Sequence, residues 1–324
     1  MKSFDFLTVN THNFEEQALA VFQYQAARCQ VYKDFLRFLN INPKKITAVQ
    51  DIPFLPIQFF KSHAIVSNQK PIEETFLSSG TTGMRQSKHL VTDVTLYEKS
   101  YLNTFENFYG NIKEYTVLAL LPSYLERNGS SLIYMIKDLI DKSENPDSGF
   151  YLHNHQELFD QLLEQERKQK KTLLVGVSFA LLDFIEKHPC SLKYTIVMET
   201  GGMKGKRKEM IREELHAELK KGFGTTHIHS EYGMTELLSQ AYYTDTQKFN
   251  CPPWMKILIR DTEDALSLLP NEKSGGINVI DLANINSCSF VATQDLGKTY
   301  SDGTFDVLGR FDNSDLRGCN LLIQ

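Results

Sequence analysis

"TLLVGVSFALLDFIEK", residues 172–187, joins a short β-rich apolar run to an amphipathic segment of helical length. The same alternation recurs on both sides of it, in YTVLALLP (115–122), SSLIYMIKDLI (130–140), YTIVMET (194–200), KEMIREELHAELKK (208–221) and THIHSEYG (226–233). Strands that alternate with helices are typical of βαβ units and of a mainly parallel sheet. Ligands on such sheets bind beyond the carboxyl ends of the strands, so polar residues that follow these strands are candidates for a site.

The pattern changes after about residue 250. Closely spaced strand candidates with turn residues between them replace the helical periodicity: WMKILIRD (254–261), GGINVIDL (275–282), SFVATQDL (289–296) and GTFDVLGR (303–310). We predict an α/β fold in which a mainly parallel sheet flanked by helices (1–250) carries a smaller β-rich lobe (251–310). A short C-terminal segment (311–324) follows.

The N-terminal region predicts a helix and an extended connector. In NFEE, Asn13 and Glu16 have the spacing of a capping box, ahead of a helix that runs towards Phe38. In DIPFLPIQFFKSHAI (51–65), two prolines disfavour a helix, and we expect an extended segment whose aromatic residues dock on the core.

Composition restricts the function. The chain has 324 residues and a net charge of -5, which argues against a general nucleic-acid binder. Its five cysteines are scattered, without a C-x-x-C pair, as in a reducing compartment. No signal peptide or membrane-spanning run is evident, so we expect a cytoplasmic protein that is not inserted in a membrane. The oligomeric state stays open.

The segment FLSSGTTGMRQSKH (76–89) has the residues of a phosphate-binding loop. Glycines let backbone amides approach an anion, and hydroxyls together with Arg85 or Lys88 add donors. The loop residues are Ser78, Ser79, Gly80, Thr81, Thr82 and Gly83. We expect this loop between an extended segment and a helix that starts near Thr92. It is not a Walker A motif, and taken alone it is equally consistent with an ordinary turn.

Three further motifs follow in a particular order: YGMTE (232–236), TQDLG (293–297) and GRFD (309–312). With SSGTTG they resemble the adenylate-forming superfamily of acyl- and aryl-CoA synthetases, whose signatures T-S-G-T-T-G, Y-G-x-T-E, T-G-D-L-G and G-R-x-D occur in this order. The resemblance covers roughly residues 50 to 318. It implies that the protein binds ATP or AMP together with Mg²⁺ and acts on a small carboxylic acid.

The resemblance also implies roles for individual residues. The loop residues would bind the ATP phosphates. Tyr232, followed by Gly233, would pack near the adenine, and Thr235 would face the phosphates. Glu236 would hold magnesium, Asp295 would bind the ribose hydroxyls, and Arg310 would assist at the ribose or phosphate. In the segment ETGGMKG, Gly201 and Gly202 offer a close backbone approach for a flat group, although a plain turn explains the same residues.

The sequence departs from the superfamily in three places. MRQSK (84–88) replaces the usual Pro-Lys after the loop, and Gln294 replaces the glycine of T-G-D. Only 14 residues follow Arg310, so we expect the mobile C-terminal lid of the superfamily, with its adenylation lysine, to be absent.

The segments IPFLPIQFFK (52–61), LPSYLERNGSSLIYM (121–135) and DLRGCNLL (315–322) are similar to the acyl-protein synthetases of the bacterial luciferase fatty-acid reductase system. This branch implies a fatty-acyl adenylate and transfer of its acyl group to a cysteine near the C-terminus, for which Cys319 is the match. The acyl group would pass to a partner protein, a reductase or an acyl carrier protein, or to coenzyme A or a carrier pantetheine. Alternatively, Cys319 is an apolar residue that docks the C-terminus.

The residues that would contact the acid lie in LPSYLERNGSSL, where Ser123, Tyr124 and Arg127 are candidates for the wall of the acyl site. A surface loop that ends in a helix N-cap at Ser130 or Ser131 explains the same letters equally well.

Two rival functions remain. The sequence GVSFA around Ser178 nearly matches the G-x-S-x-G nucleophile elbow, and histidines at 216, 227 and 229 follow it, as in a serine acyltransferase or hydrolase. A catalytically reduced nucleotide- or acyl-binding protein is the other alternative. The pairs His153/His155 and His227/His229 lack a specified third ligand, so we interpret them as structural or solvent-facing rather than as a metal site.

Overall fold

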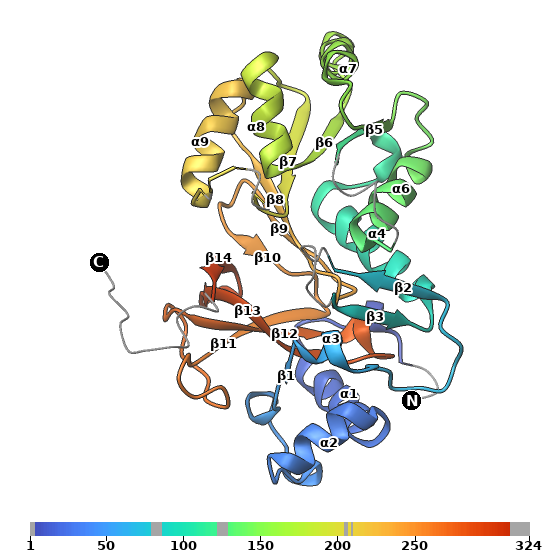
Figure 1. Cartoon of the computed structure of the whole chain (residues 1–324), viewed down its shortest axis with the longest axis vertical. Coiled ribbons are helices and arrows are strands. Elements are labelled where there is room, and N and C mark those ends of the chain that lie inside the picture. Colours follow the sequence, from blue (N-terminus) through green and yellow to red (C-terminus); the bar gives the residue numbers. More distant parts are fainter. Residues whose placement is uncertain (1–3, 79–85, 122–128, 204–206, 209, 312–324) are drawn as a thin grey trace.

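The computed structural model describes residues 4–78, 86–121, 129–203, 207–208 and 210–311. In this part of the chain one sheet of twelve strands runs through the molecule in the order β11-β12-β13-β14-β10-β9-β8-β7-β6-β4-β5, and β1 pairs with β13 (Figure 1). None of the described helices combines the length and the apolar character needed to cross a bilayer.

The predicted βαβ region forms the parallel half of this sheet. Strand β6 (Thr172–Val177) is buried along its whole length, as expected for a strand covered on both faces. It pairs in parallel with β4 (Thr116–Leu120) on one side and with β7 (Thr195–Thr200) on the other, and the parallel set continues to β5 (Gly149–Tyr151) beside β4 and to β8 (His229–Tyr232) beside β7. Helices α8 (Ser178–Lys187) and α9 (Arg212–Phe223) lie on one side of these strands, and α4 (Val94–Tyr109) and α6 (Ser131–Ser143) lie on the other (Figure 1). The α/β prediction is therefore confirmed.

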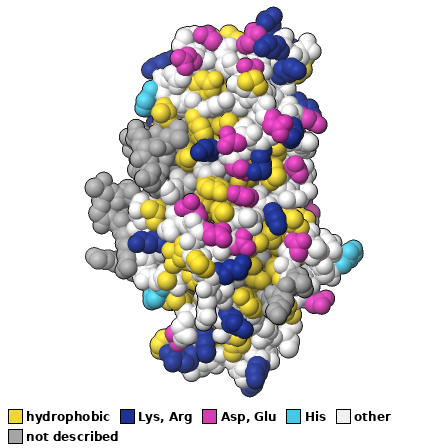
Figure 2. Space-filling model, turned by 90° about the vertical axis from the view of Figure 1, so that its right-hand side faces the viewer, with side chains coloured by type: hydrophobic (Ala, Val, Ile, Leu, Met, Phe, Trp, Pro, Cys, Tyr) yellow, Lys and Arg dark blue, Asp and Glu magenta, His cyan; other side chains and the backbone are white. Residues whose placement is uncertain are grey.

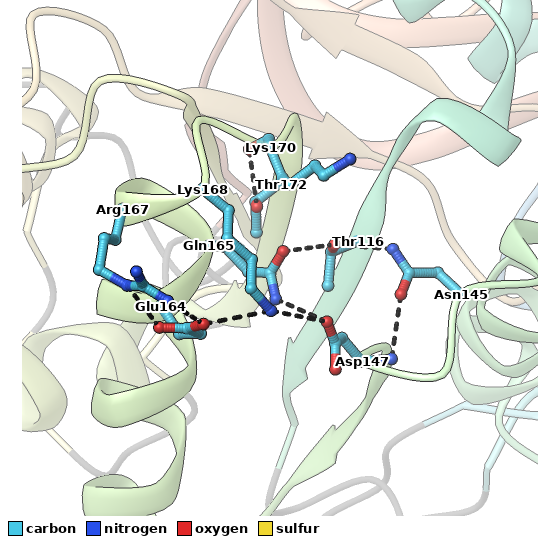
Figure 3. A network of polar contacts seen from close by, with 9 residues as sticks. All are labelled: Thr116, Asn145, Asp147, Glu164, Gln165, Arg167, Lys168, Lys170 and Thr172. Atoms are coloured by element: carbon cyan, nitrogen blue, oxygen red, sulfur yellow. Dashed lines mark hydrogen bonds and ion pairs between the residues drawn. The ribbon is translucent and has the colours of Figure 1, made fainter.

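Helix α7 (His155–Arg167) is joined to the parallel strands by a buried polar network (Figure 3). The buried Gln165 accepts a hydrogen bond from the Thr116 hydroxyl (3.1 Å) and donates one to Asp147 (3.0 Å). Asn145 donates to the same Thr116 oxygen at 2.8 Å. Because a buried amide is costly unless its donors and acceptors are paired, this network fixes α7 in one position.

The antiparallel half begins where β9 (Ala241–Tyr243) reverses the chain direction beside β8. It continues through β10 (Phe249–Asn250), β14 (Phe305–Arg310), β13 (Phe290–Thr299), β12 (Gly275–Asp281) and β11 (Met255–Arg260). In the register of β13 and β14, Asp295 lies opposite Arg310. The strands expected after residue 250 therefore extend the parallel sheet rather than forming a separate one.

The N-terminal region differs from the prediction. Two helices, α1 (Phe14–Arg28) and α2 (Gln30–Phe38), replace the expected single helix, because Cys29 between them has extended backbone angles (φ -80°, ψ 104°). The capping box is wrong: Asn13 makes no side-chain cap bond, and its side chain instead accepts a hydrogen bond from the Asn10 amide. In the proline-rich connector, β1 (Leu55–Pro56) is extended as predicted, and α3 (Phe59–Ser62) is a short helix.

The strands β2 (Glu74–Leu77) and β3 (Lys88–Val91) form a separate antiparallel pair. The expected helix start near Thr92 lies slightly later, at Val94, and a strand precedes it. The glycine-hydroxyl segment therefore joins two strands of a hairpin instead of leading directly into a helix.

Short 3₁₀ helices complete the described elements. They are η1 (Phe6–Thr8), η2 (Pro43–Lys45), η3 (Val49–Asp51), η4 (Ile112–Glu114) and η5 (Leu282–Asn284). On the face shown in Figure 2, acidic and basic side chains are interspersed with apolar ones.

Candidate functional site

Three strands bring Tyr232, Asp295 and Arg310 together. Tyr232 ends β8, and its hydroxyl donates a hydrogen bond of 2.9 Å to Asp295 Oδ2 on β13. The Nε of Arg310, on β14, donates to the other carboxylate oxygen at 2.9 Å. Asp295 is buried, whereas 79% of the Arg310 side chain is exposed, so the guanidinium is open to a ligand. The charge of Asp295 raises the pKa of Arg310.

Two aromatic rings hold the Tyr232 ring in place. Phe249 and Phe305 pack edge-on against it, with ring centroids 5.8 and 5.6 Å away. Burial, followed by the charge of Asp295, raises the pKa of Tyr232 well above its ordinary value. The phenol therefore stays protonated and remains a hydrogen-bond donor.

Glu236 follows β8 by four residues and is buried. Burial raises the pKa of its carboxyl group, although a hydrogen bond from Ser87 and the charge of Arg310 oppose this effect. A buried carboxylate with little charge compensation is costly, so a cation beside Glu236 would be stabilising.

The backbone around Glu236 is held from several elements. The carbonyl of Thr235 lies 2.8 Å from His89 Nδ1, and the carbonyl of Glu236 accepts from Asn284 at 2.9 Å. The amides of Leu238 and Ser239 both donate to Asp281 Oδ2, at 2.8 and 3.0 Å. These contacts fix the segment that carries the carboxylate before any ligand binds.

Sequence reasoning gave no role to Glu231, which precedes Tyr232. This residue keeps some exposure, but its carboxyl group is enclosed and accepts a hydrogen bond of 2.6 Å from the Thr200 hydroxyl. Burial raises its pKa to about 7, and the charge of Glu199 acts in the same direction. A Cβ on Gly233 would lie 2.2 Å from Glu231 Oε1, so a larger residue there would displace this carboxyl group.

The predicted phosphate loop is only partly described. The Ser78 hydroxyl accepts a hydrogen bond from the Ser87 amide at 2.8 Å, and the Ser78 amide donates to the Ser87 carbonyl at 3.1 Å. Ser78 thus closes the base of the hairpin. Lys88 is exposed on β3. The other predicted residues of this loop lie outside the described part of the chain: Ser79, Gly80, Thr81, Thr82 and Gly83.

Gly201 and Gly202 follow β7, next to the carboxyl end of β8. Gly201 has a positive φ of 65°, which favours glycine, and a Cβ on Gly202 would meet no atom within 4 Å. Both are exposed, so the backbone at this strand end is accessible. Ser123, Tyr124, Arg127 and Cys319 lie outside the described residues, whereas Ser130 is the N-cap of α6, with its hydroxyl accepting from Ile133 at 3.3 Å.

The geometry around Ser178 differs from that of a nucleophile elbow. Ser178 is buried, and its hydroxyl donates to Glu199 Oε2 at 2.9 Å. His216 Nε2 contacts Ser230 at 3.1 Å and lies 3.7 Å from the other Glu199 oxygen. Burial alone would raise the pKa of Glu199, but hydrogen bonds from His216 and Ser230 lower it overall. Glu199 therefore separates Ser178 from His216, and no described contact lets the imidazole take the serine proton.

The second H-x-H pair shares an acidic partner. His227 and His229 both approach Asp245 Oδ1, at 3.3 and 3.2 Å, and His229 also contacts the Tyr109 hydroxyl. Among the described residues no cluster of three or more histidine, cysteine or acidic side chains is placed to hold a metal ion.

Comparison with known protein structures identifies the fold of this chain. No family model matches the chain. A 2-hydroxyisobutyryl-CoA ligase, solved with 2-HIB-AMP, superposes on 92% of this chain and 67% of its own, with a TM-score of 0.66 and 11% identity. The chain has the adenylate-forming fold. ATP-bound MatB from Rhodopseudomonas palustris agrees with this result, at a TM-score of 0.55 and 17% identity over 76% of this chain.

The chain spans about half of the MatB structure (49%). A curated relative, the long-chain-fatty-acid–luciferin-component ligase of Photorhabdus luminescens, is 34% identical over 68 residues, which are 21% of this chain and 58% of that protein. The similarity to this ligase is therefore confined to about a fifth of the chain.

Proposed function

We propose that this adenylate-forming protein activates a carboxylic acid with Mg-ATP and then transfers the acyl group to a thiol. The observation that carries the proposal is the cluster of Tyr232, Asp295 and Arg310, assembled from three strands beside the buried Glu236. These residues are the ones that the superfamily motifs select, and Tyr232 lies at the carboxyl end of the parallel strand β8, the kind of position at which ligands bind on such sheets.

In the first step, a carboxylate oxygen of the acid attacks the α-phosphorus of ATP, and the bond to the departing pyrophosphate breaks. Both reactants are anions, so positive charge and hydrogen-bond donors must offset their repulsion. Asp295 would accept hydrogen bonds from the ribose hydroxyls, and the exposed guanidinium of Arg310 would neutralise phosphate charge. Tyr232 would form one wall of the adenine site.

Glu236 fits a magnesium site. Its buried carboxyl has a raised pKa, so a nearby cation would favour the ionised form that binds metal. Magnesium is usually held by one or two carboxylates together with substrate phosphates, which agrees with a single acidic residue here. The ion would supply charge neutralisation at the phosphate oxygens. Thr235 would place its hydroxyl towards the same phosphates.

In the second step, a thiolate attacks the acyl carbon of the adenylate, a thioester forms and AMP leaves with the electron pair of the broken bond. Cys319, a partner cysteine or a pantetheine would supply the thiol. The fatty-acid ligase relative supports an aliphatic acid as the substrate, with Ser123, Tyr124 and Arg127 at its site. A protein acceptor, a reductase or a carrier protein, would receive the acyl group.

The experiment is to incubate the protein with Mg-ATP and labelled acids, both fatty acids of different length and aromatic acids, with and without hydroxylamine. Formation of a hydroxamate supports the activated acyl intermediate. Label that stays on the denatured wild-type protein, and is lost in Cys319→Ser, supports the thiol transfer. Absence of hydroxamate with every acid, aliphatic or aromatic, would overturn the proposed activation step.

A further inference from the structure

The hairpin that carries the glycine-hydroxyl segment is not hydrogen-bonded into the main sheet. Its strands β2 and β3 pair only with each other among the described residues. Glu236, in contrast, follows β8 in the centre of that sheet. The distance between the hairpin and Glu236 therefore depends on side-chain contacts instead of a strand ladder.

Ser87, directly before β3, hydrogen-bonds the Glu236 carboxyl group, and His89 provides a second contact of this kind. His89 lies on β3 directly after Lys88, is 1% exposed, and packs edge-on against Phe60 at 5.7 Å between ring centroids. Its Nδ1 lies 2.8 Å from the carbonyl oxygen of Thr235, and its Nε2 lies 3.1 Å from Asn284 Oδ1. One buried ring thus contacts both the main chain beside Glu236 and the side chain of η5.

Asn284 contacts the same segment from the other side of the His89 ring. Its Nδ2 donates to the carbonyl of Glu236 at 2.9 Å and to that of Cys288 at 3.1 Å. These two acceptors define which end of the amide is nitrogen, so the oxygen faces His89. His89 and Asn284 together contact the carbonyl groups of Thr235 and Glu236, two consecutive residues.

The ring nitrogens of His89 therefore face two acceptors. Burial lowers the pKa of His89 to about 4, so the ring is neutral at pH 7 and carries one N–H. The shorter contact, to the Thr235 carbonyl, is the one that requires this proton. His89 then acts as a donor to the main chain beside the metal-binding carboxylate.

We propose that His89 and Asn284 are positioning residues, which hold the backbone of Thr235 and Glu236 at a fixed distance from the hairpin of the phosphate-binding segment. Neither residue touches the substrate. They set the separation between the described strands β2 and β3 and the carboxylate that would bind magnesium. This inference rests on the proposed function for its catalytic consequence.

The test compares His89→Leu with His89→Asn, in which the amide nitrogen stands close to the place of Nδ1 and keeps a donor for the Thr235 carbonyl. The control is His229→Leu, which removes another buried, doubly contacted histidine, at the start of β8. We expect His89→Leu to raise the half-saturating concentrations of Mg²⁺ and ATP about fivefold to tenfold, the effect of one lost buried hydrogen bond.

The expected pattern has four further parts. In His89→Asn, the half-saturating concentrations of Mg²⁺ and ATP return to within about twofold of wild type. His229→Leu changes the thermal stability but not the Mg²⁺ dependence. The KM for the acid stays constant in all variants. Asn284→Asp, which places an oxygen against the Glu236 and Cys288 carbonyls, raises the same two concentrations. Folding of each variant is checked by its thermal unfolding midpoint.

Direct binding of Mg-ATP, measured by calorimetry alongside acid-dependent pyrophosphate exchange, separates this proposal from the proposed function. Wild-type binding without exchange would overturn the function, and the binding constants of the variants would still decide the positioning role. A folded His89→Leu protein with wild-type Mg²⁺ and ATP dependence would overturn the positioning role. Equal changes in His89→Leu and His229→Leu would do the same.

Discussion

Glu231 makes the stability of this protein depend on pH in a way that one substitution should remove. Its enclosed carboxyl group has a pKa of about 7, against an ordinary value of 4.5. The folded state therefore binds this proton more tightly than the unfolded state. The resulting stabilisation is fully present below pH 4.5, falls as the pH rises, and is lost above pH 7.

The size of the effect follows from the two pKa values. For a single group that moves from 4.5 to about 7, the free energy of unfolding falls by about 2.5 kcal/mol between pH 5 and pH 8. Glu231→Gln replaces the protonated carboxyl group by a neutral amide of the same shape, so this contribution disappears. Other titrating groups act equally in both proteins and cancel in the difference.

The assay is urea unfolding at several pH values, followed by the fluorescence of the single tryptophan, Trp254, which is buried. The stability of the variant relative to wild type should increase by about 2.5 kcal/mol between pH 5 and pH 8. A difference between the two proteins that stays constant over this range would refute the assigned burial of the Glu231 carboxyl group.

Three other substitutions test the site. Tyr232→Phe removes the hydroxyl that donates to Asp295 and should lower the free energy of unfolding by about 1–2 kcal/mol in the same urea assay; no change would show that this hydrogen bond is not formed. Asp295→Asn should raise the half-saturating ATP concentration in pyrophosphate exchange about tenfold, because a charged acceptor for the ribose is lost; wild-type affinity would contradict the ribose role. Ser178→Ala should leave the exchange rate within about twofold of wild type, since its hydroxyl bonds to Glu199; loss of activity would restore the serine-nucleophile hypothesis.

The sequence predicted the elements best where hydrophobic periodicity was strong. The run 172–187 became β6 and α8, because an apolar strand and an amphipathic helix each have one stable way to bury their side chains in a layered sheet. The break at Cys29 was missed, since the apolar pattern continues through it and only the backbone angles change. Strand β3 was missed because KHLV is short and directly precedes a helix.

The sequence motifs selected residues that lie together in the structure, but they did not indicate the residues that contact them. Tyr232, Asp295 and Arg310 stand in recognisable motifs, and the structure brings them into contact. His89 contacts Thr235 across 146 residues of sequence and Asn284 across 195, so no local pattern indicates either pairing. Such long-range contacts depend on the tertiary fold, which periodicity and short motifs do not specify.

The central claim is adenylation, and exchange of labelled pyrophosphate into ATP tests it most directly. The measurement uses a panel of fatty and aromatic acids with no acyl acceptor present, in wild type and in Glu236→Gln, which keeps the shape of the side chain but removes its charge. The account predicts exchange that requires both an acid and Mg²⁺, and a loss of at least about tenfold in the variant. Binding of ATP without exchange for any acid, or full exchange in Glu236→Gln, would contradict it.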